Sequence, residues 1–421
     1  MGIGQSTLHD GIGSGSVCPV LSRDPANART WGVGWVGEVR RCKGGSRLTV
    51  KVLHILNELN PSGAEVMLRC AADQWAELGL GSVILSTGAQ PGPYASHLRA
   101  AGYRVEHIPY APSVRFFRAV QQFVVAGQYH VVHLHAERAN LWLSLAVRSA
   151  GVSHIVRTIH SVFPFSGLLR LRRRMQRWVL RRLLGVQMIS ISPSVQENEA
   201  KRFQNFTPVI PNWYDSHRFV PPTPREREEA RSQLGIDPHS FVIISVGNCS
   251  PIKNHLSIIE ALTLVPDSVP VLYLHVGREE TNNPERRLAV ARAVSPRVRF
   301  FGMVDDILPY LHAADAFIMP STHEGFGVAA VEAMGAGLPV ILSRVPGLRD
   351  FEGLEAPITW VEPTAESIAG TVAALFKVGP EKRLNLGLNL SHAVGRYYGI
   401  EQRCKSYAAL YTDRDVGAYS H

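Results

Sequence analysis

The sequence predicts an α/β protein with two Rossmann-like domains, each built around a doubly wound parallel sheet. Buried strand-like runs alternate with helix-like segments through both halves of the chain. The chain has 421 residues, more than one hydrophobic core usually organises. A polar, proline-rich stretch, residues 213–227, separates the two series and is typical of an interdomain linker. The cleft between two such facing domains is the expected ligand site.

The first series begins with the strand pattern LTVKVLHIL, residues 48–56, which leads through a glycine-containing loop into a helical pattern. Strand, loop and helix in this order form the repeating unit of a doubly wound sheet. Further strands are expected at residues 82–87, 103–108, 130–135, 154–160, 187–192 and 208–211.

The second series repeats this alternation after the linker. Strands are expected at residues 241–247, 270–277, 298–302, 315–320 and 340–343, and helices at residues 254–262, 284–294 and 306–314. A last helix near residues 393–411 is expected to cover a sheet face.

These patterns divide the chain into five parts. The glycine- and serine-rich start has no useful periodicity and is expected to be a disordered extension. The predicted parts are this extension at 1–47, an N-terminal Rossmann-like domain at 48–212, the linker at 213–227, a C-terminal Rossmann-like domain at 228–395, and a helix and tail at 396–421.

Composition indicates an ordinary globular protein of a reducing compartment. Hydrophobic residues make up 45% and charged residues 19% of the chain. The five cysteines show no CxxC spacing, which argues against a disulfide framework or a zinc knuckle. No apolar run is long enough to span a bilayer, and no signal pattern opens the chain. We therefore expect a cytoplasmic protein without a nucleic-acid partner.

The stretch from residue 319 to residue 343 is the most informative in the chain. Gly325 and Gly327 let a backbone turn approach a ligand closely, and the helix that begins near Val328 points its amide donors at that turn. Glu324 and Glu332 flank this ready anion site. Because carboxylates beside a phosphate are unfavourable, they are expected to bind something else, such as sugar hydroxyls. A glycine turn that merely packs tightly is the alternative.

Two further loops offer positive charge at the carboxyl ends of predicted strands. Lys253 follows the strand at 241–247 and can reach a diphosphate as a point charge, unless it is a solvated surface lysine. Gly63 opens a helix in the loop NPSGAE and forms a second anion site. This loop lacks GxGxxG, which disfavours a nicotinamide dinucleotide.

Three histidines lie on neighbouring predicted strands. His133 and His135 share a strand face, and His160 ends the next strand. No HExxH motif accompanies them, so no metal site is expected. His160 is expected to donate a hydrogen bond or a proton in the cleft. Asp413 and Asp415 spell DxD, but no strand precedes them, and we discard them as a metal motif.

The run LLRLRRRMQRWVLRRLL, residues 168–184, predicts a basic amphipathic helix. Leu168, Leu171, Met175 and Trp178 share one side, with most arginines opposite. Two interpretations stay open. The helix lies on an anionic membrane surface, or it packs its apolar side on the sheet. The net charge of +9 comes mostly from arginine and likewise reflects either compositional bias or attraction to anionic partners.

The motifs together resemble the retaining glycosyltransferases of the GT-B fold, family 4 (group 1). The segment HEGFGVAAVEAMGAGLPVILS resembles the family's E-x7-E stretch and is the most specific match. The segments NPSGAE, HVVHLH, ISPSVQENEAKRF, PVIPNWYDSHRF, VGNCSPIKN and VRFFGMVDDI follow the family's order. The resemblance covers the chain from about residue 48 to the C-terminal helix.

This resemblance implies transfer of a sugar from a nucleotide-sugar to a glycan or lipid-linked acceptor, with retention and without a required metal or other cofactor. Glu324 would bind sugar hydroxyls, Glu332 the ribose, and Lys253 the leaving diphosphate. His160 matches a histidine near the reacting carbon. The implied catalytic residues are His160, Glu324 and Lys253, and the implied donor-binding residues are Gly63, Asn248, Lys253, Glu324, Gly325, Phe326, Gly327, Val328 and Glu332.

The chain departs from the family pattern at three positions. Asn248 stands where members often have arginine, Ser62 where the first loop usually has glycine, and Trp213 where the linker usually has glycine. The resemblance implies a role in cell-surface polysaccharide or glycolipid synthesis. In the interpretation in which the basic helix at residues 168–184 lies on a membrane, the protein is expected to attach peripherally to the inner face of the cytoplasmic membrane. A sugar-nucleotide epimerase of the same fold and a non-catalytic nucleotide-sugar-binding homologue are the alternatives.

Overall fold

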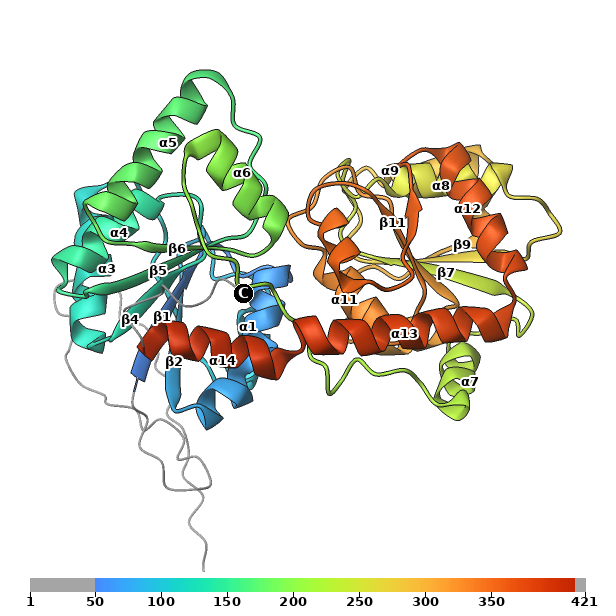
Figure 1. The fold of residues 1–421 in the computed structure, drawn as a ribbon, viewed down its shortest axis with the longest axis horizontal. Coiled ribbons are helices and arrows are strands. Elements are labelled where there is room, and N and C mark those ends of the chain that lie inside the picture. Colours follow the sequence, from blue (N-terminus) through green and yellow to red (C-terminus); the bar gives the residue numbers. More distant parts are fainter. Residues whose placement is uncertain (1–49, 413–421) are drawn as a thin grey trace, which may run out of the picture. The chain divides into compact units, whose positions relative to one another are not determined.

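The computed structural model describes residues 50–412, which form two parallel six-stranded sheets with flanking helices (Figure 1). The predicted extension at 1–47 and the DxD pair Asp413 and Asp415 lie outside the described residues. The α/β prediction with two Rossmann-like sheets is confirmed.

The first sheet has the strand order β3-β2-β1-β4-β5-β6. The order reverses between β1 and β4, and in such sheets a ligand crevice forms at the reversal. Its strands are β1 (Val50–Leu56), β2 (Leu80–Ser86), β3 (Arg104–His107), β4 (Val131–Leu134), β5 (His154–Ile159) and β6 (Gln187–Ser190). Its helices are α1 (Gly63–Glu77), α2 (Ala95–Ala100), α3 (Val114–Gly127), α4 (Asn140–Ser149), α5 (Gly167–Arg182) and α6 (Pro193–Phe203).

The strands of this sheet are buried on both faces, so side chains alternate between two cores. Leu53 and Ile55 of β1 pack in the core that contains side chains of α3, α4 and α5. Val52 and Leu56 pack in the other, with side chains of α1, α2 and the last helix. His54 also lies on this second face, where its ring stacks on Trp75.

The second sheet has the order β12-β11-β10-β7-β8-β9. Its strands are β7 (Phe241–Val246), β8 (Val271–Val276), β9 (Val298–Phe300), β10 (Ala316–Met319), β11 (Val340–Ser343) and β12 (Thr359–Val361). Its helices are α7 (Pro224–Gln233), α8 (His255–Leu264), α9 (Pro284–Ala291), α10 (Leu308–Ala313), α11 (Val328–Gly335), α12 (Ala365–Lys377) and α13 (Pro380–Tyr398), with short 3-10 turns η1 (Ser295–Arg297) and η2 (Arg349–Leu354).

The chain ends in two helices, where one was expected near residues 393–411. Helix α13 packs on α11, and α14 (Ile400–Thr412) packs on α1 and β1 (Figure 1). Gly399 separates them, and the Tyr214 amide donates to the Tyr398 carbonyl at 3.2 Å beside this break. The C-terminus therefore contributes Cys404, Tyr407 and Tyr411 to the core of the first sheet.

Two other expected elements differ. The segment 208–211 is not a strand, because Val209 forms a single bridge with Ser190. The expected linker runs into α7, which begins at Pro224 behind a capping box of Thr223 and Glu226.

Two absences hold for residues 50–412. No helix there is long and apolar enough to cross a membrane. The cysteines in this range, Cys70, Cys249 and Cys404, are free thiols.

Candidate functional site

The glycine turn after β10 packs against the end of β5. A Cβ atom added to Gly325 would lie 2.3 Å from the His160 carbonyl oxygen, which no real side chain tolerates. Ser192 Oγ donates to the Gly325 carbonyl at 2.9 Å from the start of α6. Glycine at this position thus allows the turn to approach the backbone beside His160.

Two helix N-termini meet beside this turn. Gly63 begins α1 and Val328 begins α11, and a Cβ on Gly63 would lie 3.2 Å from Val328 Cγ2. Gly327 precedes α11 with φ of 90°, a conformation that favours glycine. Unpaired amides and the helix dipole give each N-terminus a partial positive charge. The pair creates a local positive potential suited to an anion.

Lys253 and Glu324 form an ion pair at the carboxyl ends of β7 and β10. Lys253 Nζ lies 2.6 Å from Glu324 Oε1, and Ser321 Oγ donates to the same oxygen at 2.9 Å. The side chains are 26% and 12% exposed, so a ligand can still reach them. The structure thus brings together two residues that are far apart in the sequence and were both expected in the site.

Asn248 supports the neighbouring loop. Its Oδ1 accepts a hydrogen bond from the Arg278 amide at 3.0 Å. Gly247, with φ of 152°, lies beside the Lys253 stem, since an added Cβ would be 3.4 Å from Lys253 Cε. The side-chain carbonyl of Asn248 is therefore used to connect the loop after β7 to the loop after β8.

Glu332 of α11 is buried with 6% of its surface exposed. Burial raises the pKa of this carboxyl to about 8, although the nearby charges of Arg218 and Arg69 lower it and Asp215 raises it. No hydrogen-bond donor of residues 50–412 reaches the carboxyl group. Arg69 and Arg218 were not predicted as site residues, although Arg218 lies in the motif PVIPNWYDSHRF, one residue before its end.

Phe326 was expected to line the donor site, but its side chain is buried in a cluster of aromatic rings. The Phe326 ring lies 5.4 Å from that of Phe351 and 5.1 Å from that of Tyr398, both edge-on. Only the backbone of Phe326 is left to face a ligand, and the side chain anchors the glycine turn.

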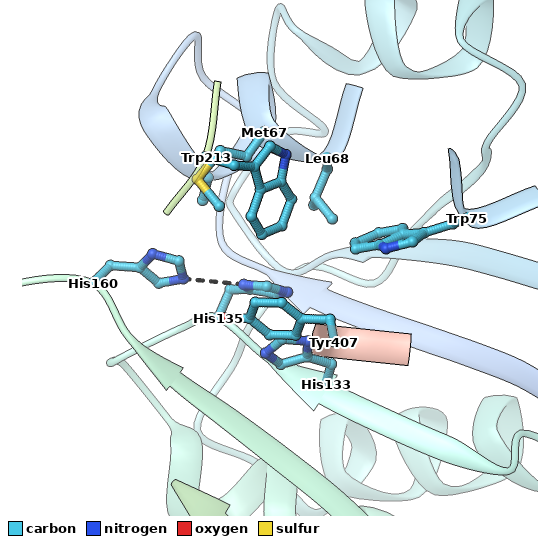
Figure 2. A pocket seen from close by; sticks show the side chains of 9 residues that line it. Met67, Leu68, Trp75, His133, His135, His160, Trp213 and Tyr407 are labelled. Carbon is cyan, nitrogen blue, oxygen red and sulfur yellow. Dashed lines mark hydrogen bonds between the residues drawn. The ribbon is translucent and has the colours of Figure 1, made fainter. Parts of the chain in front are cut away.

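A histidine cluster lies behind the site, on the second face of the first sheet (Figure 2). His135 Nδ1 lies 3.0 Å from His160 Nε2, and His135 Nε2 lies 3.2 Å from His54 Nδ1. His133 instead contacts the Tyr411 hydroxyl at 2.6 Å and the Thr158 hydroxyl at 2.7 Å. His54 was missed from the sequence, because its in-register pairing with His133 depends on the strand order.

Helix α5 exposes its apolar side. Leu168 is 86% exposed, and Leu171, Met175 and Trp178 are each more than half exposed. This contradicts the interpretation in which these residues pack on the sheet. The prediction that Arg177 lies on the exposed basic side of this helix is also wrong. Arg177 is buried, and its Nε donates to Glu199 Oε2 at 2.6 Å.

Helices α4 and α5 border a hollow of about 460 Å³. Three arginines and several apolar side chains face it together. Its lining includes Arg138, Arg172, Arg173, Leu141, Trp142, Met175 and Val179. The hollow is therefore both cationic and apolar.

Two family models match adjoining parts of the chain. The model described as Glycosyltransferase Family 4 matches residues 61–218. The model described as Glycosyl transferases group 1 matches residues 226–390. The two matches meet near the linker and correspond to the two sheets.

Two curated proteins are similar to this chain along most of their length. The chain is 28% identical over 308 residues to a UDP-Gal:alpha-D-GlcNAc-diphosphoundecaprenol alpha-1,3-galactosyltransferase of Escherichia coli, covering 69% of this chain and 76% of that protein. It is 25% identical over 339 residues to the putative glycosyltransferase EpsF of Bacillus subtilis, covering 76% and 88%.

Solved structures share the fold. A glycosyltransferase from Rickettsia africae superposes with a TM-score of 0.75 at 18% identity, covering 86% of this chain and 98% of that one. HepE from Anabaena, solved with UDP and glucose, superposes with a TM-score of 0.73 at 20% identity, covering 86% and 100%. By its sequence and its fold, this chain belongs to the family 4 (group 1) glycosyltransferases of the GT-B fold.

Proposed function

We propose that this protein transfers a sugar from a nucleotide-sugar to a lipid-linked or glycan acceptor, with retention of the anomeric configuration and without a required metal. The observation that supports this most is the ion pair of Lys253 and Glu324 beside the paired N-termini of α1 and α11. This arrangement supplies a cation and two sets of amides to a diphosphate, and a carboxylate to the sugar next to it.

Departure of the diphosphate is the step that this site would assist. Fixed positive charge lowers the barrier when it is preorganised where negative charge develops. Lys253 and the two helix N-termini would supply that charge, which is the role a metal plays in other transferases. Neither nearby carboxyl is a free nucleophile, because Glu324 is paired with Lys253 and burial raises the pKa of Glu332 to about 8. Both facts disfavour a double displacement through an enzyme carboxylate. Retention would instead require the acceptor hydroxyl to bond to the sugar carbon on the face from which the diphosphate leaves, with the hydroxyl proton passing to the departing phosphate oxygen.

The acceptor is proposed to be an amphiphile that enters over α4 and α5. The hollow there combines Arg138, Arg172 and Arg173 with the exposed rings and chains of Trp142 and Met175. Arginines bind phosphate, and the apolar side chains suit an alkyl chain. The E. coli relative, which by its name acts on a diphosphoundecaprenol-linked sugar, agrees with such an acceptor. We infer a role in cell-surface polysaccharide or glycolipid synthesis at the cytoplasmic face of a membrane.

The function is tested with the purified full chain and a panel of UDP-, GDP- and ADP-sugars. The true donor should raise the melting temperature, because a ligand of the native state stabilises it by mass action. The stabilising donor is then incubated with a lipid-diphosphate sugar, and the linkage of the product is determined by NMR. Transfer with the donor's anomeric configuration is expected. Inversion, or epimerisation of the donor alone, would contradict the proposal.

A further inference from the structure

Three imidazole rings form a continuous hydrogen-bonded chain that ends at the site. His54 Nδ1 lies 3.2 Å from His135 Nε2. His135 Nδ1 lies 3.0 Å from His160 Nε2, the contact that Figure 2 marks with a dashed line. His54 is fully buried and stacks on Trp75, with the ring centroids 5.0 Å apart and the planes at 2°. This stacking holds the inner end of the chain in place.

Each of the three rings is neutral at neutral pH. Burial lowers the pKa of His54 to about 3 and that of His160 to about 4, and it lowers the pKa of His135 well below the ordinary value. A neutral imidazole has one N–H group and one bare nitrogen. His135, in the middle, must therefore donate to one neighbour and accept from the other.

Only two proton arrangements satisfy both contacts. In the first, His54 Nδ1 donates to His135, His135 Nδ1 donates to His160, and the proton of His160 is on Nδ1. In the second, His160 Nε2 donates inward, His160 Nδ1 is bare, and the proton of His54 is on Nε2. His160 Nδ1 can therefore donate a hydrogen bond to a ligand in the first arrangement and can only accept one in the second.

The inner end of the chain decides between them. His54 Nε2 is buried and has no hydrogen-bond partner among residues 50–412. The first arrangement leaves a bare nitrogen there, whereas the second leaves an unpaired N–H group. Unpaired buried N–H groups are rarer in proteins than under-used acceptors, so the first arrangement is favoured.

We propose that His54 and His135 lock His160 in the tautomer that carries its proton on Nδ1, so that His160 offers an N–H donor to the ligand. His54 and His135 are then positioning residues. The group that His160 contacts must be an acceptor, such as a hydroxyl or phosphate oxygen of the nucleotide-sugar. That identification of the ligand rests on the proposed function, whereas the tautomer itself does not.

The hydrogen-bonded chain of His54, His135 and His160 prevents His160 from acting as a base. In the proposed tautomer, His160 Nε2 accepts the hydrogen bond from His135 Nδ1, and His160 Nδ1 carries the proton. Proton transfer along the chain would need a proton source at His54 Nε2, which is buried against Trp75. His160 is therefore a hydrogen-bond donor and does not carry protons to or from the reacting groups.

A metal ion is the competing occupant of this cluster. Ring nitrogens of His54, His133 and His135 lie close enough together to hold one. However, both ring nitrogens of His133 are engaged by hydroxyl groups, at 2.6 Å from Tyr411 and 2.7 Å from Thr158. Two histidines alone make a poor zinc site, which normally has three or four protein ligands. The contacts favour hydrogen bonds.

The tautomer is measured by NMR on the full chain with isotope-labelled histidine at neutral pH. The His160→Gln variant identifies the His160 signals. We expect nitrogen shifts that place the proton of His160 on Nδ1. The proposal would be overturned by a proton on His160 Nε2 or by an even mixture of the two tautomers. It would also be overturned if the purified protein retained one zinc ion per molecule.

A variant of His135 then tests whether the tautomer of His160 affects sugar transfer. His135→Leu should give His160 a mixture of tautomers and lower kcat/KM about tenfold, the worth of one hydrogen bond. Tyr411→Phe is the matched control. It removes the hydroxyl that contacts the neighbouring His133 and leaves the hydrogen bonds between His54, His135 and His160 in place. If His135→Leu does not fold, the spectrum of the unaltered protein still decides. If no sugar transfer is found at all, the proposed function fails while the tautomer stays measurable.

Discussion

Lys253 Nζ lies 2.6 Å from Glu324 Oε1, so the cation that would meet a diphosphate is paired with a carboxylate of the same site. The pair sits where β7 and β10, neighbours in the second sheet, both end. A donor entering this site would have to exchange the contact for two new ones, between Lys253 and phosphate and between Glu324 and hydroxyls. The pair keeps each partly buried charge compensated until then.

Lys253→Ala should lower kcat by roughly two to three powers of ten, if the lysine supplies about 3–4 kcal/mol to the leaving group. Donor binding should weaken less, because the charge matters most when the diphosphate departs. Single-turnover rates and donor titrations separate the two effects. Lys377→Ala, which removes an exposed lysine on α12, is the control. Unchanged turnover in the Lys253 variant would rule out the leaving-group role.

Gly325→Ala should inactivate the enzyme and destabilise it by about 1–3 kcal/mol, since its Cβ would lie 2.3 Å from the His160 carbonyl oxygen. The backbone of one loop must move to accept it. Gly353→Ala is a matched control, because an added Cβ there meets no atom within 4 Å. Denaturant unfolding and kcat/KM measure both effects. Equal behaviour of the two variants would show that the turn is not tightly packed.

Donor affinity should depend on the protonation of Glu332. Burial raises the pKa of this carboxyl to about 8, so it is protonated at neutral pH in the free protein. A ribose hydroxyl would donate to the ionised form, and binding should therefore release a proton below pH 8. Calorimetry in buffers of different ionisation enthalpy measures this proton. Glu332→Gln should bind the donor more weakly and release none.

The same carboxyl makes stability fall as pH rises. The folded pKa of about 8 lies above the unfolded value of 4.5, so the folded state binds more protons between these values. Its stabilising contribution is complete below the unfolded pKa and is lost as pH rises through 8. Glu332→Gln should flatten the free energy of unfolding over this window, while Glu366→Gln on the exposed side of α12 should not.

Sequence patterns predicted most strands, because strands of a doubly wound sheet are buried on both faces and appear as apolar runs. FVIISV and AFIM are such runs, and both form strands. The edge strand β12 was missed, because it has only three residues. The segment 208–211 looked like a strand, but the pairing that makes a strand depends on neighbours that no local pattern shows.

The site could be predicted where its residues stand at strand ends, and not where it depends on register. Lys253 and Glu324 follow strands of the second sheet and His160 follows a strand of the first, so each stands at the carboxyl edge of its own parallel sheet. His54 lies inside β1, and its partnership with His135 requires the pairing of β1 with β4. Burial of Arg177 was likewise hidden, since its partner Glu199 is on the next helix, α6.

Arg177→Gln should destabilise the protein by about 3–5 kcal/mol, because it leaves the fully buried Glu199 without its cation. Asn205, which donates to the same carboxylate at 2.8 Å, cannot replace the charge. Arg174→Gln, on the exposed side of the same helix, should change stability by less than about 0.5 kcal/mol. Urea unfolding of the two variants checks this difference. Similar stabilities of the two variants would contradict a structural role for the buried ion pair of Arg177 and Glu199.

Helix α5 should bind the protein to anionic vesicles through its exposed leucines, Met175 and Trp178 and through the arginines beside them. Flotation with phosphatidylglycerol vesicles should show binding that weakens with salt, and phosphatidylcholine vesicles should bind poorly. Replacing Arg170, Arg172 and Arg174 with Gln should weaken binding by up to about a hundredfold, at about 1 kcal/mol for each arginine. Arg177 is kept, since it supports the fold.

The control for this triple variant removes three exposed arginines elsewhere. Arg225, Arg292 and Arg344 lie on the second half of the chain and form surface ion pairs, which contribute little to stability. Both triple variants have the same net charge. A general attraction between a basic protein and an anionic surface would weaken equally in the two. Loss of binding confined to the α5 variant would therefore locate the contact on that helix, and equal loss would refute it.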